Sequence, residues 1–157
     1  MKNKINEQTK MTGLIRVIKE NVITGVKTIQ IYKNVICTVG KTAIGRRLIN
    51  TALKTNEGMI TYGATGTGNT TPAATDIKLT TEISRKQIAS SYYTANVITI
   101  RTFFNTSNSN GNIEEFGLFG EDATSTTDSG TMFNHVLISL TKTSSETLTV
   151  ECEITIA

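Results

Sequence analysis

The chain has 157 residues, enough for one domain with its own hydrophobic core. Apolar residues make up 38% of it and aromatic residues 6%, while 29 residues are threonine, a β-branched type that suits pleated surfaces with one wet face. No segment reaches the roughly 18 apolar residues that a membrane helix needs, and no apolar segment follows the basic start, so we expect neither a membrane span nor a signal peptide.

The net charge of +3 conceals an uneven distribution along the chain. Residues 1–60 hold eleven Lys and Arg against three Glu, a net charge of +8. Residues 61–157 hold five basic against ten acidic residues, a net charge of −5. This division favours head-to-tail contacts between copies or docking on charged neighbours, and a plain solvated surface is the alternative interpretation.

The cysteine content argues against disulfides and metal sites. Cys37 and Cys152 are the only cysteines, and in a protein made in a reducing cytoplasm we expect two free, buried thiols. With a single histidine in the chain, their spacing fits no metal site, and we expect no cofactor. Nucleic-acid binding is disfavoured, because Tyr32 is the only aromatic residue before Tyr62 and no recognition motif is present.

The N-terminal part of the chain predicts an arm followed by a β-hairpin. Residues 1–12 are polar and are expected to form a flexible arm, and residues 13–157 to form a single β-rich domain. The apolar segment 13–18 and the alternating segment 26–36 flank a turn at 21–25, which is typical of a hairpin.

Residues 42–54 change from strand to helix periodicity. Ile44, Leu48 and Ala52 recur at every fourth position and form one apolar stripe. Thr42 is suited to be the N-cap, so the sequence predicts one α-helix at about 42–54.

The rest of the chain predicts further strands separated by polar loops. Strands are expected at these segments: 59–64, 96–106, 113–120, 132–141 and the alternating C-terminal segment 147–156. The segment 78–93 is ambiguous, because its apolar spacing fits a helical turn and its Thr and Ser content favours a strand. About seven strands and one helix predict a mainly β fold, an antiparallel β-sandwich or barrel-like domain.

The Gly40-Lys41-Thr42 triplet matches only the end of a phosphate-binding loop. The first glycine of that motif would stand at position 35, which is Val35. No later strand ends in an acidic residue that would help to hold magnesium. Nucleotide hydrolysis is therefore disfavoured, and no catalytic residue is predicted.

The remaining titratable residues favour structural roles. His135 lies within a predicted strand and is expected to be a partly buried structural histidine. Glu114 and Glu115 are adjacent on a strand and point to opposite faces, so they are poorly placed to act together. One of them is expected to be buried against Arg85 or Arg101.

Two longer segments carry a pattern of spaced residues. They are "ITYGATGTGNTTPAATDIKLTTEISRKQI" at 60–88 and "GNIEEFGLFGEDATSTTDSGTMFNHV" at 111–136. This order of glycines, acidic residues and apolar residues resembles the collar-like domain at the attachment end of bacteriophage tail fibres, and small stand-alone virion proteins with the same pattern. The matching positions are Tyr62, Gly66, Gly68, Thr75, Leu79, Glu82, Arg85, Glu115, Gly117, Leu118 and Phe119.

The resemblance implies a non-catalytic structural protein of the virion, made in the host bacterial cytoplasm, which docks on a tail, neck, baseplate or capsid surface. Homo-oligomers are expected, with the N-terminal arm ordering on an adjacent subunit. In such a unit Glu82, Arg85 and Glu115 are expected to form a semi-buried ion network that fixes the strand register.

Two alternatives stay open at this stage. We expect neither a fibre shaft nor a receptor-binding tip, which favours a short adaptor, or a capsid decoration (cement) protein that stabilises the phage head. A carbohydrate-binding β-sandwich is disfavoured, because sugar sites usually need exposed aromatic residues and Trp is absent.

Overall fold

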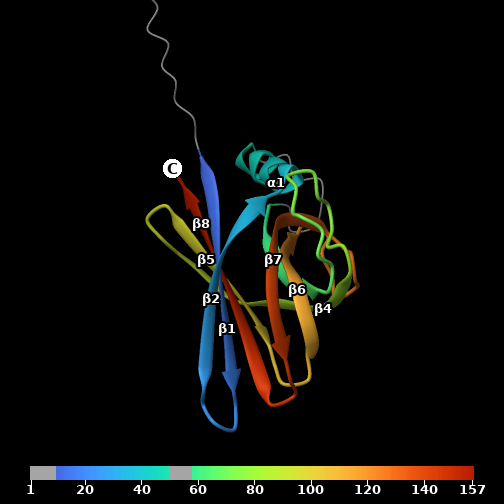
Figure 1. Cartoon of the computed structure of the whole chain (residues 1–157). Helices are drawn as coiled ribbons and strands as arrows, with labels where there is room; N and C mark the ends of the chain where they lie inside the picture. The colour runs from blue at the N-terminus through green and yellow to red at the C-terminus, as the bar shows by residue number, and fades with distance from the viewer. Residues whose placement is uncertain (1–9, 50–57) are drawn as a thin grey trace, which may run out of the picture.

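The computed structural model describes residues 10–49 and 58–157, which form a closed barrel of eight antiparallel strands and one helix (Figure 1). The predicted mainly β, barrel-like fold with one helix is confirmed. The elements are β1 (Met11–Asn21), β2 (Lys27–Ile36), α1 (Thr38–Leu48), β3 (Ile60–Gly66), β4 (Glu82–Thr94), β5 (Val97–Phe104), β6 (Gly111–Gly120), β7 (Thr131–Lys142) and β8 (Glu146–Ile156).

The strands follow the order β1-β2-β7-β6-β3-β4-β5-β8, and β8 closes the barrel on β1. Two strands pass from one side of the barrel to the other. β2 pairs with β1 up to Asn34 and with β7 only at Val35 and Ile36. β4 pairs with β3 up to Gln87 and with β5 from Ile88 onward. The segment 78–93, ambiguous from sequence, is therefore mostly strand.

The alternation of β8 builds a large part of the main core. Leu148, Val150, Cys152 and Ile154 are buried as the alternation predicts, and Ile156 at the strand end is 37% exposed. These side chains pack against apolar residues of β1, β5, β6 and β7 inside the barrel. A second, smaller core lies apart from it and consists of Cys37, Ala64, Leu79, Phe119 and Met132.

Both cysteines are free and buried, as predicted. Burial raises the pKa of the Cys37 thiol to about 12, and that of the Cys152 thiol also to about 12. Both side chains are therefore neutral, apolar core groups at physiological pH.

The helix begins earlier than the sequence predicts, and the proposed cap is wrong. α1 starts at Thr38 behind the N-cap residue Cys37, which makes no side-chain capping bond. Thr42 lies one turn inside the helix and donates its hydroxyl to the Thr38 carbonyl at 3.0 Å. The first turn is closed by the Lys41 N–H, which donates to the Cys37 carbonyl at 3.1 Å, and it packs closely on β7, since a Cβ at Gly40 would lie 2.7 Å from Cα of Phe133. Residues 50–54 of the predicted helix lie outside the described residues.

The predicted arm is too long at its C-terminal end. Met11 and Thr12 belong to β1 and pair with Ile156 and Thr155 of β8. Residues 1–9 lie outside the described residues. Within residues 10–49 and 58–157, no helix has the length and apolar character that a membrane crossing requires.

Candidate functional site: two clamped loops and an open strand edge

The side chain of Glu115 on β6 is fully buried. Its carboxylate holds the loop 67–81 through hydrogen bonds from the backbone of the loop. It accepts hydrogen bonds from the N–H groups of Gly68 at 3.0 Å, Thr80 at 2.9 Å and Thr81 at 2.8 Å. Hydrogen bonds from N–H groups to an ionised carboxylate are stronger than hydrogen bonds between two neutral groups. Glu115 therefore ties the first and last residues of a long loop to one point of the barrel.

The glycines of the "TGTG" segment make room for this carboxylate. A Cβ at Gly68 would lie 2.5 Å from Oε1 of Glu115, and a Cβ at Gly66 would overlap the same oxygen. Real Cβ atoms do not approach other atoms so closely. The Glu115 carboxylate therefore fits at this place only because positions 66 and 68 are glycines.

His135 on β7 extends this site to a second carboxylate. Its Nε2 lies 3.0 Å from Oε2 of Glu115 and its Nδ1 lies 2.7 Å from Oδ2 of Asp76. Each ring nitrogen thus lies within hydrogen-bonding distance of a carboxylate oxygen, so the imidazole bridges Glu115 and Asp76. The predicted structural role of His135 fits this geometry, but its burial is nearly complete, at 2% exposure.

Asp76 is held in its ionised form by these contacts. Burial alone would raise its pKa, but the hydrogen bond from the Ala73 N–H, at 2.8 Å, and the His135 ring together keep the pKa of Asp76 below its usual value. The middle of the loop 67–81 is thereby attached to β7.

A second buried ion pair clamps the loop 121–130. Arg85 donates to both carboxylate oxygens of Glu82, at 2.8 and 2.7 Å, and the two side chains are 1% and 0% exposed. The Arg85 guanidinium also donates to the Ser129 carbonyl at 2.7 Å and lies 4.4 Å from the centre of the Phe119 ring. It binds the loop by a hydrogen bond and the second core by a cation–π contact.

The predicted network of Glu82, Arg85 and Glu115 is therefore two adjacent networks. Glu82 and Arg85 pair as predicted, but Glu115 bonds to His135 and to the loop backbone. Arg85 pairs with Ala64 on β3, and Ala64 pairs with Gly117 on β6. Gly117 is two residues after Glu115, so Arg85 and Glu115 do not stand opposite each other. Arg101, the other candidate partner, pairs with Glu151 on the opposite sheet.

Most positions that carried the resemblance surround these networks. Leu79 and Phe119 belong to the second core, and Tyr62 packs against it. Gly117 is buried where a Cβ would lie 2.9 Å from the Asn134 carbonyl oxygen. Leu118 points into the main core instead. Thr75 is exposed, and the functional neighbour that sequence reasoning missed is the next residue, Asp76.

Comparison with protein-family models, with curated proteins and with solved structures found no match. The function of the chain therefore has to be inferred from its own geometry.

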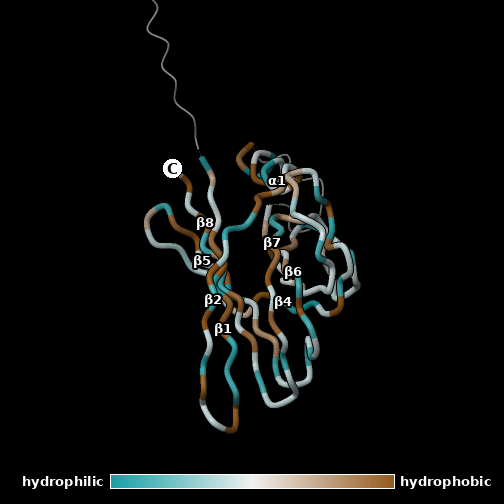
Figure 2. The backbone as a smooth tube through the Cα atoms, in the orientation of Figure 1, coloured by the Kyte–Doolittle hydropathy of each residue, from teal (hydrophilic) through white to brown (hydrophobic). Residues whose placement is uncertain are grey.

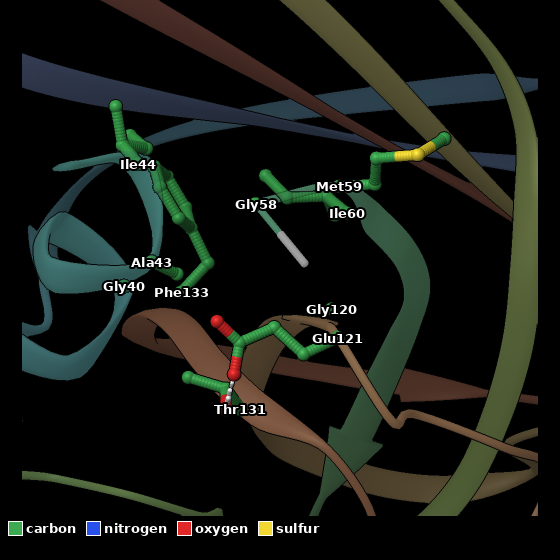
Figure 3. A pocket seen from close by; sticks show the side chains of 10 residues that line it. All are labelled: Gly40, Ala43, Ile44, Gly58, Met59, Ile60, Gly120, Glu121, Thr131 and Phe133. Atoms are coloured by element: carbon green, nitrogen blue, oxygen red, sulfur yellow. Dashed lines mark hydrogen bonds between the residues drawn. The ribbon is translucent and has the colours of Figure 1, made fainter. Parts of the chain in front are cut away.

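The small cavity that Glu121 faces beneath α1 cannot hold an organic ligand, and it lies beside a larger apolar groove of about 380 Å³ (Figure 3). The small cavity has a volume of about 10 Å³, which is room for about one water molecule. Glu121 faces it and is already bound by Arg46, at 2.7 Å, and by the Thr131 hydroxyl. Within the part of the chain that the structure describes, no group of three or more His, Cys, Asp or Glu side chains could hold a metal ion.

The β1–β2 hairpin presents a different surface. Its turn reaches beyond the neighbouring turns at the end of the barrel opposite α1 (Figure 1). Figure 2 colours both arms of the hairpin brown near this turn, as expected for apolar residues. The side chains concerned are each between 55% and 80% exposed: Val22, Ile23, Val26, Ile29 and Ile31. We call these five residues the hairpin patch.

Proposed function

We propose that the chain is a non-catalytic structural protein of bacteriophage virions, of the tail-fibre, collar or adaptor type, which assembles through contacts with copies of itself or with other virion proteins. The observation that carries this proposal is the hairpin patch. Several exposed apolar side chains on one protruding element are typical of protein–protein contact surfaces.

The buried networks support a structural role. Glu115, His135 and Asp76 bind one another and hold one loop, and Arg85 with Glu82 holds another, so these side chains are engaged within the fold. Rigid loops on a barrel give a surface of fixed shape, which suits repeated docking in a particle better than it suits an opening and closing active site.

Locating the chain in purified phage particles tests the proposal. Gold-labelled antibody against the chain is expected to decorate the tail, the neck or the baseplate in electron micrographs. Label on every capsid face would favour the decoration alternative over the tail-fibre or collar type. Particles that contain no chain by mass spectrometry would contradict the proposal as a whole.

A further inference from the structure

The hairpin patch borders a strand edge that has a partner on one side only. β2 pairs with β1 throughout 27–34, whereas its register with β7 begins at Val35. The Asn21 N–H donates to the Val26 carbonyl at 2.9 Å, which sets the phase of the β1–β2 ladder. Because hydrogen-bonded and non-hydrogen-bonded pairs alternate, the backbone groups of Ile29, Ile31 and Lys33 point away from β1, toward the open edge.

β7 does not pair with β2 along 27–34, and two of its backbone groups bond to side chains instead. The Ser139 N–H donates to the Tyr32 hydroxyl at 3.4 Å, and the Lys19 ammonium donates to the Thr141 carbonyl at 2.8 Å. Between the two strands lies a groove of about 260 Å³, which Thr28 and Gln30 line from β2. A strand added to β2 would therefore place alternate side chains in a mostly polar groove.

The other face of the added strand would meet apolar side chains. Ile29 stands opposite Ile18 and Ile31 opposite Arg16, on the outer face, because the intervening pair of Val17 and Gln30 points inward. Added apolar side chains at matching positions would cover Ile29 and Ile31 from water, which stabilises the pairing.

The charge along the edge is uneven. Lys27 near the turn pairs with Glu20 at 3.2 Å. Lys33, at the other end of β2, lines an open groove of about 670 Å³ together with Lys10, Lys41 and Glu153. The Glu153 carboxylate already pairs with Arg16 at 3.6 Å, and none of the three lysines forms an ion pair with another described residue. The barrel end of the edge is therefore positive, and a carboxylate placed there would be attracted.

We propose that the β2 edge binds an extended segment of another protein by strand addition, with apolar side chains opposite Ile31 and Ile29 and a carboxylate opposite Lys33. Every strand pair in the described barrel is antiparallel, so we expect the added strand to run antiparallel to β2. From its N-terminus, its sequence would then be Asp or Glu opposite Lys33, any residue, an apolar residue opposite Ile31, any residue, and an apolar residue opposite Ile29. This inference rests on the proposed function and names the chemistry of the docking partner.

A second copy of the chain fits this edge poorly. If two β2 strands paired antiparallel with Ile29 opposite Ile31, Lys27 would stand opposite Lys33 twice, and directly opposed like charges are destabilising. The half of β4 that β3 leaves unpaired, residues 88–94, contains no carboxylate to meet Lys33. The edge therefore selects a different protein.

The test is a fluorescence anisotropy titration with a labelled peptide, GSETVTVTSG, and with its charge-reversed form, GSKTVTVTSG. The full chain is expected to bind the first peptide saturably and at least about tenfold more tightly than the second. In Ile31→Pro the edge loses an N–H that β1 does not use, and binding should fall at least about tenfold while the fold persists. In Lys33→Glu the preference between the peptides should reverse. Lys86→Glu on β4 is the matched control and should bind like the wild type.

Circular dichroism and thermal melting would check that each variant is folded. Equal binding by Ile31→Pro and wild type, or no saturable binding of the first peptide, would overturn the proposed edge site. Self-association of the wild type that is lost in Ile31→Pro would also overturn it, since a second copy would then be the occupant. Peptide binding by a chain that is absent from phage particles would support the edge site and reject the proposed function, so the two can fail separately.

Discussion

The two loops on the barrel and the β1–β2 hairpin differ in how their backbone groups are hydrogen-bonded. The loop 67–81 gives three of its N–H groups to a single buried carboxylate, Glu115. The hairpin keeps one edge of β2 open along 27–34 and surrounds it with exposed apolar side chains. The difference indicates that the loops are fixed by the fold itself, whereas the hairpin has backbone groups left over, which we propose are completed by a strand of another protein.

The largest expected effect is the loss of the Glu115 carboxylate. Glu115→Ala leaves the buried His135 ring and three loop N–H groups without their partner, and should lower the free energy of unfolding by about 3–5 kcal/mol. Glu114→Ala, one residue earlier and partly exposed, is the matched control and should change it by less than about 0.5 kcal/mol. Urea unfolding measures both, and similar values would show that the loop is not clamped by this residue.

A smaller effect is expected from filling the space that the glycines leave. Gly66→Ala should lower the free energy of unfolding by about 1–3 kcal/mol, because its Cβ would overlap the Glu115 carboxylate. The same change at Gly45, in the exposed middle of α1 where a Cβ meets nothing within 4 Å, should instead raise it by about 0.5–1 kcal/mol. Equal effects at the two positions would contradict the packing account of the "TGTG" segment.

The pH dependence of unfolding tests the Asp76 contact with His135. The folded pKa of Asp76 is lowered, so its contribution to stability is fully present above its unfolded pKa, near about 4, and is lost as the pH falls through the folded value. Denaturation followed from about pH 5 down to pH 2 should show this acid loss in the wild type and a shallower one in Asp76→Asn. An unchanged slope in the variant would show that other carboxylates carry the effect.

The smallest expected effect on stability is at the hairpin patch. Ile29→Ala and Ile31→Ala should each change the free energy of unfolding by less than about 1 kcal/mol, because both side chains are already exposed. Ile15→Ala on the same hairpin, where the side chain is fully buried, should cost about 2–5 kcal/mol. A large cost at Ile29 or Ile31 would mean that these residues stabilise the isolated chain and are not reserved for a partner.

Sequence reasoning reached most of the fold because the strands follow a simple two-residue alternation. Leu148, Val150, Cys152 and Ile154 show the alternation that their burial confirms. The helix start was misplaced because the N-cap residue, Cys37, makes no side-chain capping bond, so no capping residue marks it in the sequence. Thr42, whose hydroxyl could cap a helix, was therefore predicted as the N-cap in place of Cys37.

The candidate site could be predicted only in part, for a similar reason. Glu82 and Arg85 are three residues apart and would point to opposite faces of a regular strand. The register shift between Ser84 and Glu82 in β4 lets them pair, and sequence reasoning grouped them only through the resemblance. The partner of Glu115 depends on which strands flank β6, an arrangement that the sequence alone does not reveal. The open edge of β2 was also out of reach, because it exists only where β2 and β7 diverge below Val35.

Native-state amide hydrogen exchange tests the central contrast most directly, since one experiment reads both regions. The N–H groups of Gly68, Thr80 and Thr81 should exchange only through large openings of the fold, close to global unfolding. Along β2, the N–H groups of Thr28 and Gln30 should be protected by β1, while those of Ile29 and Ile31 should exchange rapidly until a strand partner is added. Rapid exchange in the loop, or uniform protection along β2 in the free chain, would contradict the account.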